Sequence, residues 1–426
     1  MSFCWRYFPV FYVLPFLLAT SRVPAIASVS EILRWAVLLA GCGIAVWAGL
    51  SRARSKPGMM CSADWIMLGY LGLFLLSAAW SIDSNYTIQR AISMCLLYGS
   101  AMWAFWSYAD RLSEEYLMRL IVRTLGVVLG INLVVGGLLY PGELLAGRFQ
   151  GLFSNPNNIG LLASLALPLA AGHWLRNRNR LNFSIVMVIG LSLLACSTRS
   201  AMIGSAFAGL LVLSTLAGRR PAWVITIVVS LFVSGFVISQ TDFFEEKILR
   251  EETISTGSNR TFFWELGEDY TDKRPWLGHG FATDAVINEH YGVVLKDLKL
   301  RGYGVMSSYH GMAVQIGRPL TYTFFALLWG FIAWCMISRW RDLRLVIYVG
   351  TLASGLIVCI FESAIYSAGN CFSFLFWVVF MLAVRRVHYR NIRVNLNRNG
   401  GLLGKPRRAP VRARPVPVRV MPTSPV

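Results

Sequence analysis

Residues Asn182–Ala217 read NFSIVMVIGLSLLACSTRSAMIGSAFAGLLVLSTLA, and this stretch decides the fold class. It contains two apolar runs, 182–198 and 200–217, separated only by a hydrophilic turn around Ser197-Thr198-Arg199-Ser200. A run of about 20 apolar residues is long enough to cross a bilayer as a helix. The stretch therefore predicts two membrane spans that meet in a tight turn, with Arg199 in that turn.

Comparable apolar runs recur along the chain. The 426 residues are 56% apolar and 14% charged, whereas soluble domains have about 45–50% apolar and about 25% charged residues. The composition predicts an all-α polytopic membrane protein with about 12 transmembrane helices, since only helices and closed barrels satisfy the backbone in lipid. The expected spans are 8–27, 31–50, 64–82, 88–109, 117–140, 158–174, 182–198, 200–217, 221–240, 319–338, 345–363 and 368–384.

The distribution of Lys and Arg predicts the orientation of these spans. Basic residues crowd the connections 52–56, 176–180, 219–220 and 339–344, whereas the connections 83–87 and 364–367 contain none. By the positive-inside rule, we expect both termini in the cytoplasm, as in a polytopic inner-membrane type of protein. The formal net charge of +19 is concentrated in these loops and in the tail, so we expect membrane lipids rather than nucleic acid as its partner.

Four segments follow from this topology. Residues 1–240 hold spans one to nine, 241–318 form one large periplasmic loop, 319–384 hold spans ten to twelve, and 385–426 form a basic, Pro-rich cytoplasmic tail. The loop holds 12 acidic and 9 basic residues, and we expect a folded, partly helical cap. We expect the tail to be disordered; it is an orientation signal or a docking tail. The eight cysteines show no metal-ligand or disulfide spacing.

Several arginines stand on the expected outer side, where topology disfavours them. Arg90, Arg148 and Arg199 lie close to the membrane, and Arg260 and Arg318 lie in the long loop. Any one of them has a plain alternative, a snorkelling side chain or a structural ion pair. The set is more informative, because guanidinium groups match phosphate oxygens bidentately. A convergent set would bind a membrane-anchored phosphate or pyrophosphate.

Local motifs add further candidates. In Gly147–Gly160, GRFQGLFSNPNNIG, the Asn-Pro-Asn turn predicts Asn157 or Asn158 as a helix N-cap beside Arg148. The small residues of STRSAMIG, 197–204, permit close helix packing around Arg199. His310 is placed to accept a proton from a sugar hydroxyl. Glu362 is a functional candidate near the bilayer edge, or the partner of an outer arginine.

These pieces, in this order, resemble the family of O-antigen ligases and Wzy-like or ExoQ-like polysaccharide polymerases. The resemblance covers roughly residues 75–385 and includes SNRTFFW at 258–264, RPWLGHG at 274–280, SSYHGMAVQIG at 307–317 and FESAIYSAGNCFSFLFW at 361–377. It implies a fold similar to membrane glycosyltransferases of the GT-C class. It also implies transfer of a glycan from undecaprenyl pyrophosphate to a glycan or lipid A-core acceptor at the periplasmic face.

The resemblance also implies roles for individual residues. The family's arginine in the tight turn falls on Arg199, the loop arginine on Arg260, the one before Asn-Pro-Asn on Arg148, and the loop histidine on His310. Gly311 departs from the family, in which many members have Asn after the histidine. Arg90, Arg318 and Glu362 are supporting candidates, and a chain-length regulator is a candidate partner.

The chemistry expected from the residues agrees with these roles. A lipid diphosphate is already a good leaving group, so catalysis needs cations for the departing pyrophosphate and a base for the incoming hydroxyl. No Walker-type loop or Asp-x-Asp motif is present in the sequence, and we expect no cofactor and no metal. The leading interpretation is a polymerase that joins lipid-linked repeat units into exopolysaccharide or O-antigen. The alternatives are a ligase, a flippase of lipid-linked oligosaccharides and a structural partner in an export complex. A flippase would be expected to carry internal repeats.

Overall fold

The computed structural model describes residues 3–52, 60–145, 148–218, 260–291 and 304–400. The chain divides into two compact units, residues 1–385 and 386–426, and both the helical bundle and the cap belong to the first. The predicted span 221–240 and the loop residues 241–259 and 292–303 lie outside the described residues. The described chain is almost entirely helical, with one isolated β-bridge between Ser21 and Phe153.

Helices occupy all of the predicted spans that the structure describes. In the first half of the chain they are α1 Phe3–Leu18, α2 Pro24–Arg52, α3 Ser62–Leu76, α4 Ser84–Gly99, α5 Phe105–Leu112, α6 Glu114–Ile131, α7 Gly137–Leu139, α8 Pro141–Leu145, α9 Pro156–Arg176, α10 Arg180–Cys196 and α11 Arg199–Leu216. In the second half they are α15 Arg260–Lys273, α16 Ile287–His290, α17 Ser308–Ile316, α18 Arg318–Arg339, α19 Leu343–Cys359 and α20 Cys371–Gly400. Seven candidate spans among the described residues are long and apolar enough to cross a membrane. The coarse prediction of a helical polytopic membrane protein is therefore confirmed, and the count of spans stays a prediction.

Two sequence predictions about helix ends are wrong. The expected span 8–27 is interrupted, because α1 ends at Leu18 and α2 begins at Pro24. Proline suits the first turn of a helix, where its missing N–H leaves no bond unmade. The tail expected to be disordered from residue 385 is helical as far as Gly400. Residues 385–400 lack proline, and the first proline of the tail is Pro406.

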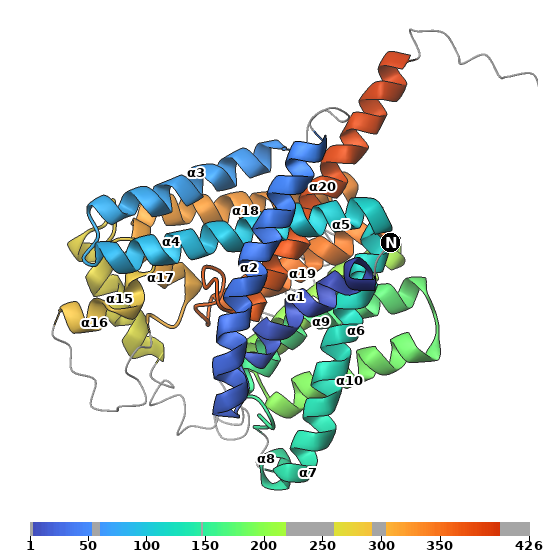
Figure 1. Ribbon diagram of the computed structural model, residues 1–426, viewed down its shortest axis with the longest axis horizontal. Coiled ribbons are helices and arrows are strands. Elements are labelled where there is room, and N and C mark those ends of the chain that lie inside the picture. The colour runs from blue at the N-terminus through green and yellow to red at the C-terminus, as the bar shows by residue number, and fades with distance from the viewer. Residues whose placement is uncertain (1–2, 53–59, 146–147, 219–259, 292–303, 401–426) are drawn as a thin grey trace, which may run out of the picture. The chain divides into compact units, whose positions relative to one another are not determined.

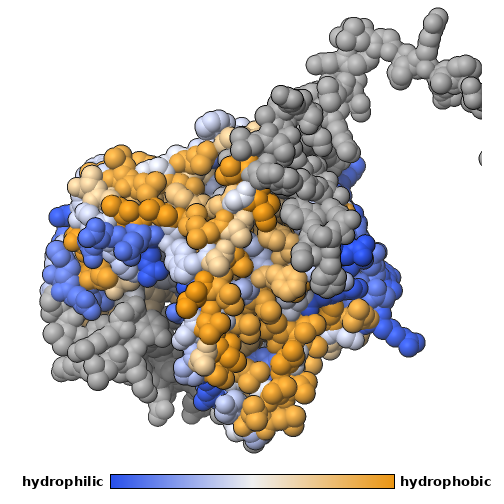
Figure 2. Space-filling view, viewed as in Figure 1, coloured by the Kyte–Doolittle hydropathy of each residue, from blue (hydrophilic) through white to orange (hydrophobic). Residues whose placement is uncertain are grey.

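Helices α19 and α20 form the centre of the bundle. In the apolar stretch Cys371–His388 of α20, 89% of the residues are buried, against 17% in Pro24–Ile44 of α2, which lies at the periphery. Helix α11 packs closely on α19, since a Cβ on Gly204 would lie 2.7 Å from the Ser354 carbonyl oxygen. The predicted close packing after Arg199 is thereby confirmed. Figure 2 shows apolar residues across the middle of the visible face, with hydrophilic residues towards its left and right.

The helix ends fall into two groups, which we call the cap end and the basic end. The cap end carries α15–α17 and the connections 19–23, 80–83, 148–155, 197–198 and 360–370; in Figure 1, α15–α17 lie together beside the turn between α3 and α4. The basic end carries the connections 112–114, 177–179 and 340–342. It includes Arg119, Arg176, Arg178, Arg180, Arg339, Arg341 and Arg344.

The cap has its own small apolar core. Tyr270, Ile287, Val305 and Val314 are all buried against one another. His279 is fully buried, with Nδ1 3.2 Å from the Val314 carbonyl and Nε2 2.9 Å from the Tyr291 hydroxyl. Burial lowers the pKa of His279 to about 4, so this histidine is a neutral structural group. The described part of the long loop is thus a folded module, and it is fixed to the α3–α4 turn by bonds such as Ile82 N to His279 O, 3.0 Å.

Candidate functional site

The loop that carries Arg148 is held by the side chains of Glu143 and Asn132. Glu143 accepts hydrogen bonds from the backbone N–H of Gly151, at 2.9 Å, and from Arg22 Nη1, at 2.7 Å. Asn132, the first residue of a π-helical turn at Asn132–Gly136, accepts from Leu152 N at 2.7 Å. The loop backbone is fixed by these bonds, while the Arg148 side chain is exposed.

The N-terminus of α9 follows this loop, and its cap differs from the predicted one. Asn155 has an extended backbone and accepts from Asn157 N at 2.9 Å, and Pro156 occupies the first helical position. The prediction of Asn157 or Asn158 as the N-cap is therefore wrong, because proline pre-sets the first helical residue and moves the cap to its predecessor. Asn157 instead donates from Nδ2 to Glu362 Oε1 at 3.0 Å.

The tight turn between α10 and α11 lies against both of these segments. Phe149 N donates to Ala195 O at 3.0 Å, which ties the Arg148 loop to the end of α10. A Cβ on Gly160 of α9 would lie 2.5 Å from the Thr198 side chain, so α9 and this turn are in close contact. Arg199 is the first residue of α11 and is exposed, with no ion pair to the described residues. Arg148 and Arg199 thus stand on adjoining segments near one helix N-terminus, where an anion is favoured.

His310 lies in the first turn of α17, facing α15. Its ring stacks on Trp264, with centroids 5.5 Å apart and an interplanar angle of 15°. Its Nδ1 is 3.9 Å from Glu268 Oε1. Burial lowers the pKa of His310, and the negative charge of Glu268 opposes this shift. The imidazole is therefore mainly neutral near pH 7 and able to accept a proton.

Glu362 connects the histidine helix with the arginine loops. Ser308 Oγ, two residues before His310, donates to the Glu362 carbonyl oxygen at 2.7 Å and accepts from Ala364 N at 3.0 Å. The Glu362 carboxylate accepts from Asn157 on α9. One residue of the 360–370 segment therefore joins α17 to the α9 N-terminus. The described partner of this carboxylate is the Asn157 amide, and the expected pairing with an outer arginine stays a prediction.

The remaining predicted arginines differ in their surroundings. Arg318 Nη2 pairs with Asp272 Oδ1 at 2.7 Å and so ties the start of α18 to α15. Arg90 is exposed on α4, with its guanidinium 4.8 Å above the Tyr86 ring. Arg260 begins α15, four residues before Trp264, and its side chain lies outside the described ones. Neither described cavity is lined by any predicted site residue.

A buried polar network directly supports the histidine helix. The Asp284 carboxylate accepts from Gln315 Nε2 at 2.7 Å and from the Tyr366 hydroxyl at 2.8 Å. Burial raises the pKa of Asp284 to about 6. A Cβ on Gly311 would lie about 2 Å from the Tyr366 hydroxyl, so glycine leaves the space this network occupies. The departure from the family at residue 311 thus has a steric reason.

Sequence reasoning missed Trp264 and Glu268 as neighbours of His310, and Asp284 and Tyr366 beneath it. A signal existed for the first two, because Trp264 and Glu268 are four residues apart and so lie on one face of α15. No such signal existed for Asp284 and Tyr366, which are 82 residues apart. Within the described ranges, no cluster of three or more His, Cys, Asp or Glu residues could hold a metal ion.

Comparison with known proteins agrees with the expected family. Residues 183–317 match a family model described as O-antigen ligase. The match runs from α10 to the end of α17 and includes Arg199, Arg260 and His310. It confirms the resemblance to O-antigen ligases and polysaccharide polymerases, which are glycosyltransferase-like enzymes, and favours an enzyme over a flippase. No curated protein matches the chain.

Proposed function

We propose that this chain, with its O-antigen ligase-like region, is a membrane glycosyltransferase that acts as a polysaccharide polymerase. It would transfer a glycan from undecaprenyl pyrophosphate to a glycan acceptor at the periplasmic face of a bacterial inner membrane. A single observation carries the proposal: a continuous series of contacts joins the histidine helix to both arginine segments. It runs from Ser308 through Glu362 and Asn157 to the α9 N-terminus, and from Gly160 to the Arg199 turn.

The two halves of this arrangement suit the two halves of the reaction. The pyrophosphate would lie at the α9 N-terminus, where Arg148 and Arg199 supply positive charge and the helix end favours an anion. Arg260, at the start of α15, would join them, as the resemblance implies. As the lipid diphosphate leaves, these charges would stabilise the developing negative charge. Arg90 and Arg318 would support the site from its edges.

His310 would act as the general base. Its Nδ1 is directed towards Glu268, so Nε2 is the nitrogen that would accept the proton of the attacking sugar hydroxyl. The Trp264 ring, stacked on the imidazole, restricts its rotation. This route uses no metal, and a transfer assay with purified protein is expected to be insensitive to EDTA. A requirement for divalent cations would refute that part.

A ligase that moves the finished polymer to lipid A-core is the second candidate, because the matching family model carries that description. Deletion of the gene separates the two. Loss of polymer with single repeat units remaining favours the polymerase, and polymer retained on its lipid carrier favours the ligase. Co-purification of a chain-length regulator would support the polymerase.

Substitution of the proposed residues tests the mechanism. His310→Ala and Arg199→Ala are each expected to lower transfer by about 10²-fold or more, since a base or a charge acting in the transition state is lost. His290→Ala, at an exposed histidine of the cap, and Arg178→Ala, at an exposed arginine of the basic end, are the matched controls. Full activity of either test variant would refute the role given to that residue.

A further inference from the structure

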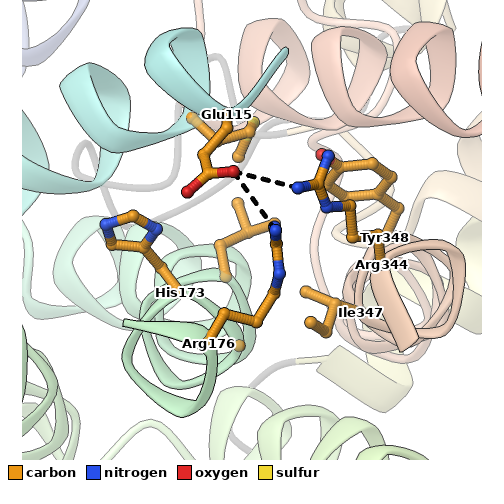
Figure 3. A pocket seen from close by; sticks show the side chains of 9 residues that line it. Glu115, His173, Arg176, Arg344, Ile347 and Tyr348 are labelled. Carbon is orange, nitrogen blue, oxygen red and sulfur yellow. Dashed lines mark hydrogen bonds and ion pairs between the residues drawn. The ribbon is translucent and has the colours of Figure 1, made fainter. Parts of the chain in front are cut away.

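A cluster of charged side chains lies at the basic end, far along the helices from His310. Its centre is Glu115 at the start of α6, which lies between Arg176 of α9 and Arg344 of α19 (Figure 3). The cluster borders a cavity of about 30 Å³, whose lining includes His173 and Tyr348 as well. Nothing in the proposed transfer reaction uses these residues.

Cations outnumber the carboxylate that they share. Glu115 Oε2 is 3.1 Å from Arg176 Nη2 and 2.9 Å from Arg344 Nη2, and Glu115 Oε1 is 3.9 Å from Arg119 Nη2. Three guanidinium groups from three helices thus surround Glu115, and the neighbouring Glu114 carboxylate accepts from the Tyr348 hydroxyl, which leaves one positive charge over among these side chains. Each of the three side chains is only 28–37% exposed, so solvent compensates this excess less well than it would at an open surface.

Most of the hydrogen-bonding capacity of these arginines is unused. A guanidinium has five N–H donors, and among the described residues Arg176 and Arg344 each make one hydrogen bond, both to Glu115 Oε2. One helical turn after Arg119, the buried Nε of Arg123 has no hydrogen-bond partner within the described part of the chain. The surroundings of the cavity therefore favour an anion.

The shape and lining of the cavity narrow the choice of anion. Glu115 already provides one planar carboxylate to these arginines. Their N–H donors come from separate helices, and such donors fit a tetrahedral anion better, because its oxygens point in several directions. The cavity holds about two water molecules, which two oxygens of a tetrahedral anion would replace. Met118, Leu169 and Ile347 form its apolar side. This combination of cations and apolar surface at the ends of membrane-spanning helices is typical of a lipid headgroup site.

We propose that this cavity binds a phosphate group, with Arg176 and Arg344 as its principal donors. The group comes either from an anionic phospholipid of the adjacent leaflet or from free phosphate. The site is separate from the transfer reaction and does not depend on the proposed function.

The test is a thermal unfolding titration of the full-length protein in a non-ionic detergent at constant ionic strength. The probes are sodium phosphate, phosphatidylglycerol and zwitterionic phosphatidylcholine. Stabilisation by phosphatidylglycerol alone identifies a lipid headgroup, and stabilisation by sodium phosphate as well identifies a site open to free phosphate. If neither anionic probe raises the unfolding temperature more than phosphatidylcholine does, the proposal is overturned.

Variants distinguish a binding site from a purely structural ion network. The double variant R176Q/R344Q is expected to need at least about tenfold more probe for half-maximal stabilisation, while R178Q, in the same loop but outside the cavity lining, responds as the parent does. Glu115→Gln removes the competing carboxylate, and we expect it to bind the probe more tightly. A lost response in E115Q, or an unchanged one in R176Q/R344Q, would show that the arginines serve only Glu115. If the double variant does not fold, the single variants and E115Q decide.

Discussion

Replacing Gly311 by alanine is expected to displace the histidine helix and remove transfer activity. The new Cβ would lie about 2 Å from the Tyr366 hydroxyl and 3.1 Å from Asp284 Oδ2. Neither neighbour can retreat easily, because Tyr366 and Asp284 are both buried and hydrogen-bonded to each other. The steric conflict must therefore move α17, tilt Tyr366, or both.

The magnitude follows from three contributions. Overpacking a buried site costs about 1–3 kcal/mol, and losing the hydrogen bond from Tyr366 to a buried carboxylate costs about 1.5–3 kcal/mol. Alanine has a higher helix propensity than glycine, which stabilises the variant by about 1 kcal/mol. The variant G311A is thus expected to be less stable by about 1.5–5 kcal/mol. A shift of His310 by about 1 Å would lower transfer by about 10²-fold.

Tyr366→Phe provides the decisive comparison, since it removes the atom that the new methyl group meets. The next ring atom, Cζ, lies 3.2 Å from the position of the added Cβ, a contact that small shifts can relieve. The double variant G311A/Y366F is expected to resemble Y366F alone rather than the sum of the single changes. Gly330→Ala in α18 is the control, because nothing lies within 4 Å of its Cβ position.

The assay combines thermal unfolding of the purified protein in detergent with glycan transfer. If the two substitutions add, or if G311A is as stable and active as the parent, the steric account of residue 311 is wrong. A coupling of about 1–3 kcal/mol between the two positions supports it.

Three further predictions concern charges at the cap end. Burial raises the pKa of Asp284 from 3.8 to about 6, so the protonated carboxyl stabilises the fold fully below pH 4, and this contribution is lost as the pH rises through 6. The free energy of unfolding should therefore fall by roughly 3 kcal/mol between pH 4 and pH 7. Asp284→Asn is expected to remove this pH dependence, as measured by unfolding over the same range. Glu268→Gln removes a negative charge that raises the pKa of His310, so the acidic limb of the pH–activity profile is expected to move to lower pH. The control variant Glu265→Gln should leave that limb in place. If the limb does not move in Glu268→Gln, the Glu268–His310 interaction has no role in the reaction. Arg318→Gln breaks an exposed pair with Asp272 and is expected to cost at most about 1 kcal/mol with transfer retained, and a large loss of transfer would instead give Arg318 a direct role.

The helices could be predicted from the sequence because the bilayer imposes one simple requirement, a long apolar run. The two runs around Arg199 lie on α10 and α11 within a few residues of their predicted ends. Ends set by local backbone chemistry were harder. Asn155 is the N-cap because Pro156 occupies the first helical position. At residues 19–23 a short turn separates α1 from α2, although the residues 8–27 form one apolar run in the sequence.

The candidate site could be predicted only as separate pieces. Residue type and local motif pointed to Arg148, Arg199 and His310, but the contacts that bring their segments together are long-range. Asn157 reaches Glu362 across 205 positions, and Ser308 reaches it across 54. A single sequence carries no periodicity over such distances. The space at Gly311 is equally invisible, since it is defined by a tyrosine from another segment.

The π-helical turn at Asn132–Gly136 has a consequence for how this loop architecture can change. A π turn contains one residue more than the α turn it replaces, so deleting a single residue there would restore the ordinary helical repeat. The residues beyond the deletion would keep nearly the same facing, because a π turn with its extra residue advances the helix by about the same rotation as an α turn without it. Gly136 would still lie against the Gly151 backbone, whereas a deletion in the regular turns of α6 would rotate Gly136 by about 100° and displace the loop that bears Arg148. Insertions and deletions of one residue in the regular turns of α6 are therefore a direct evolutionary route to reshaping the site, while the π turn is the place where one residue can be removed without this effect.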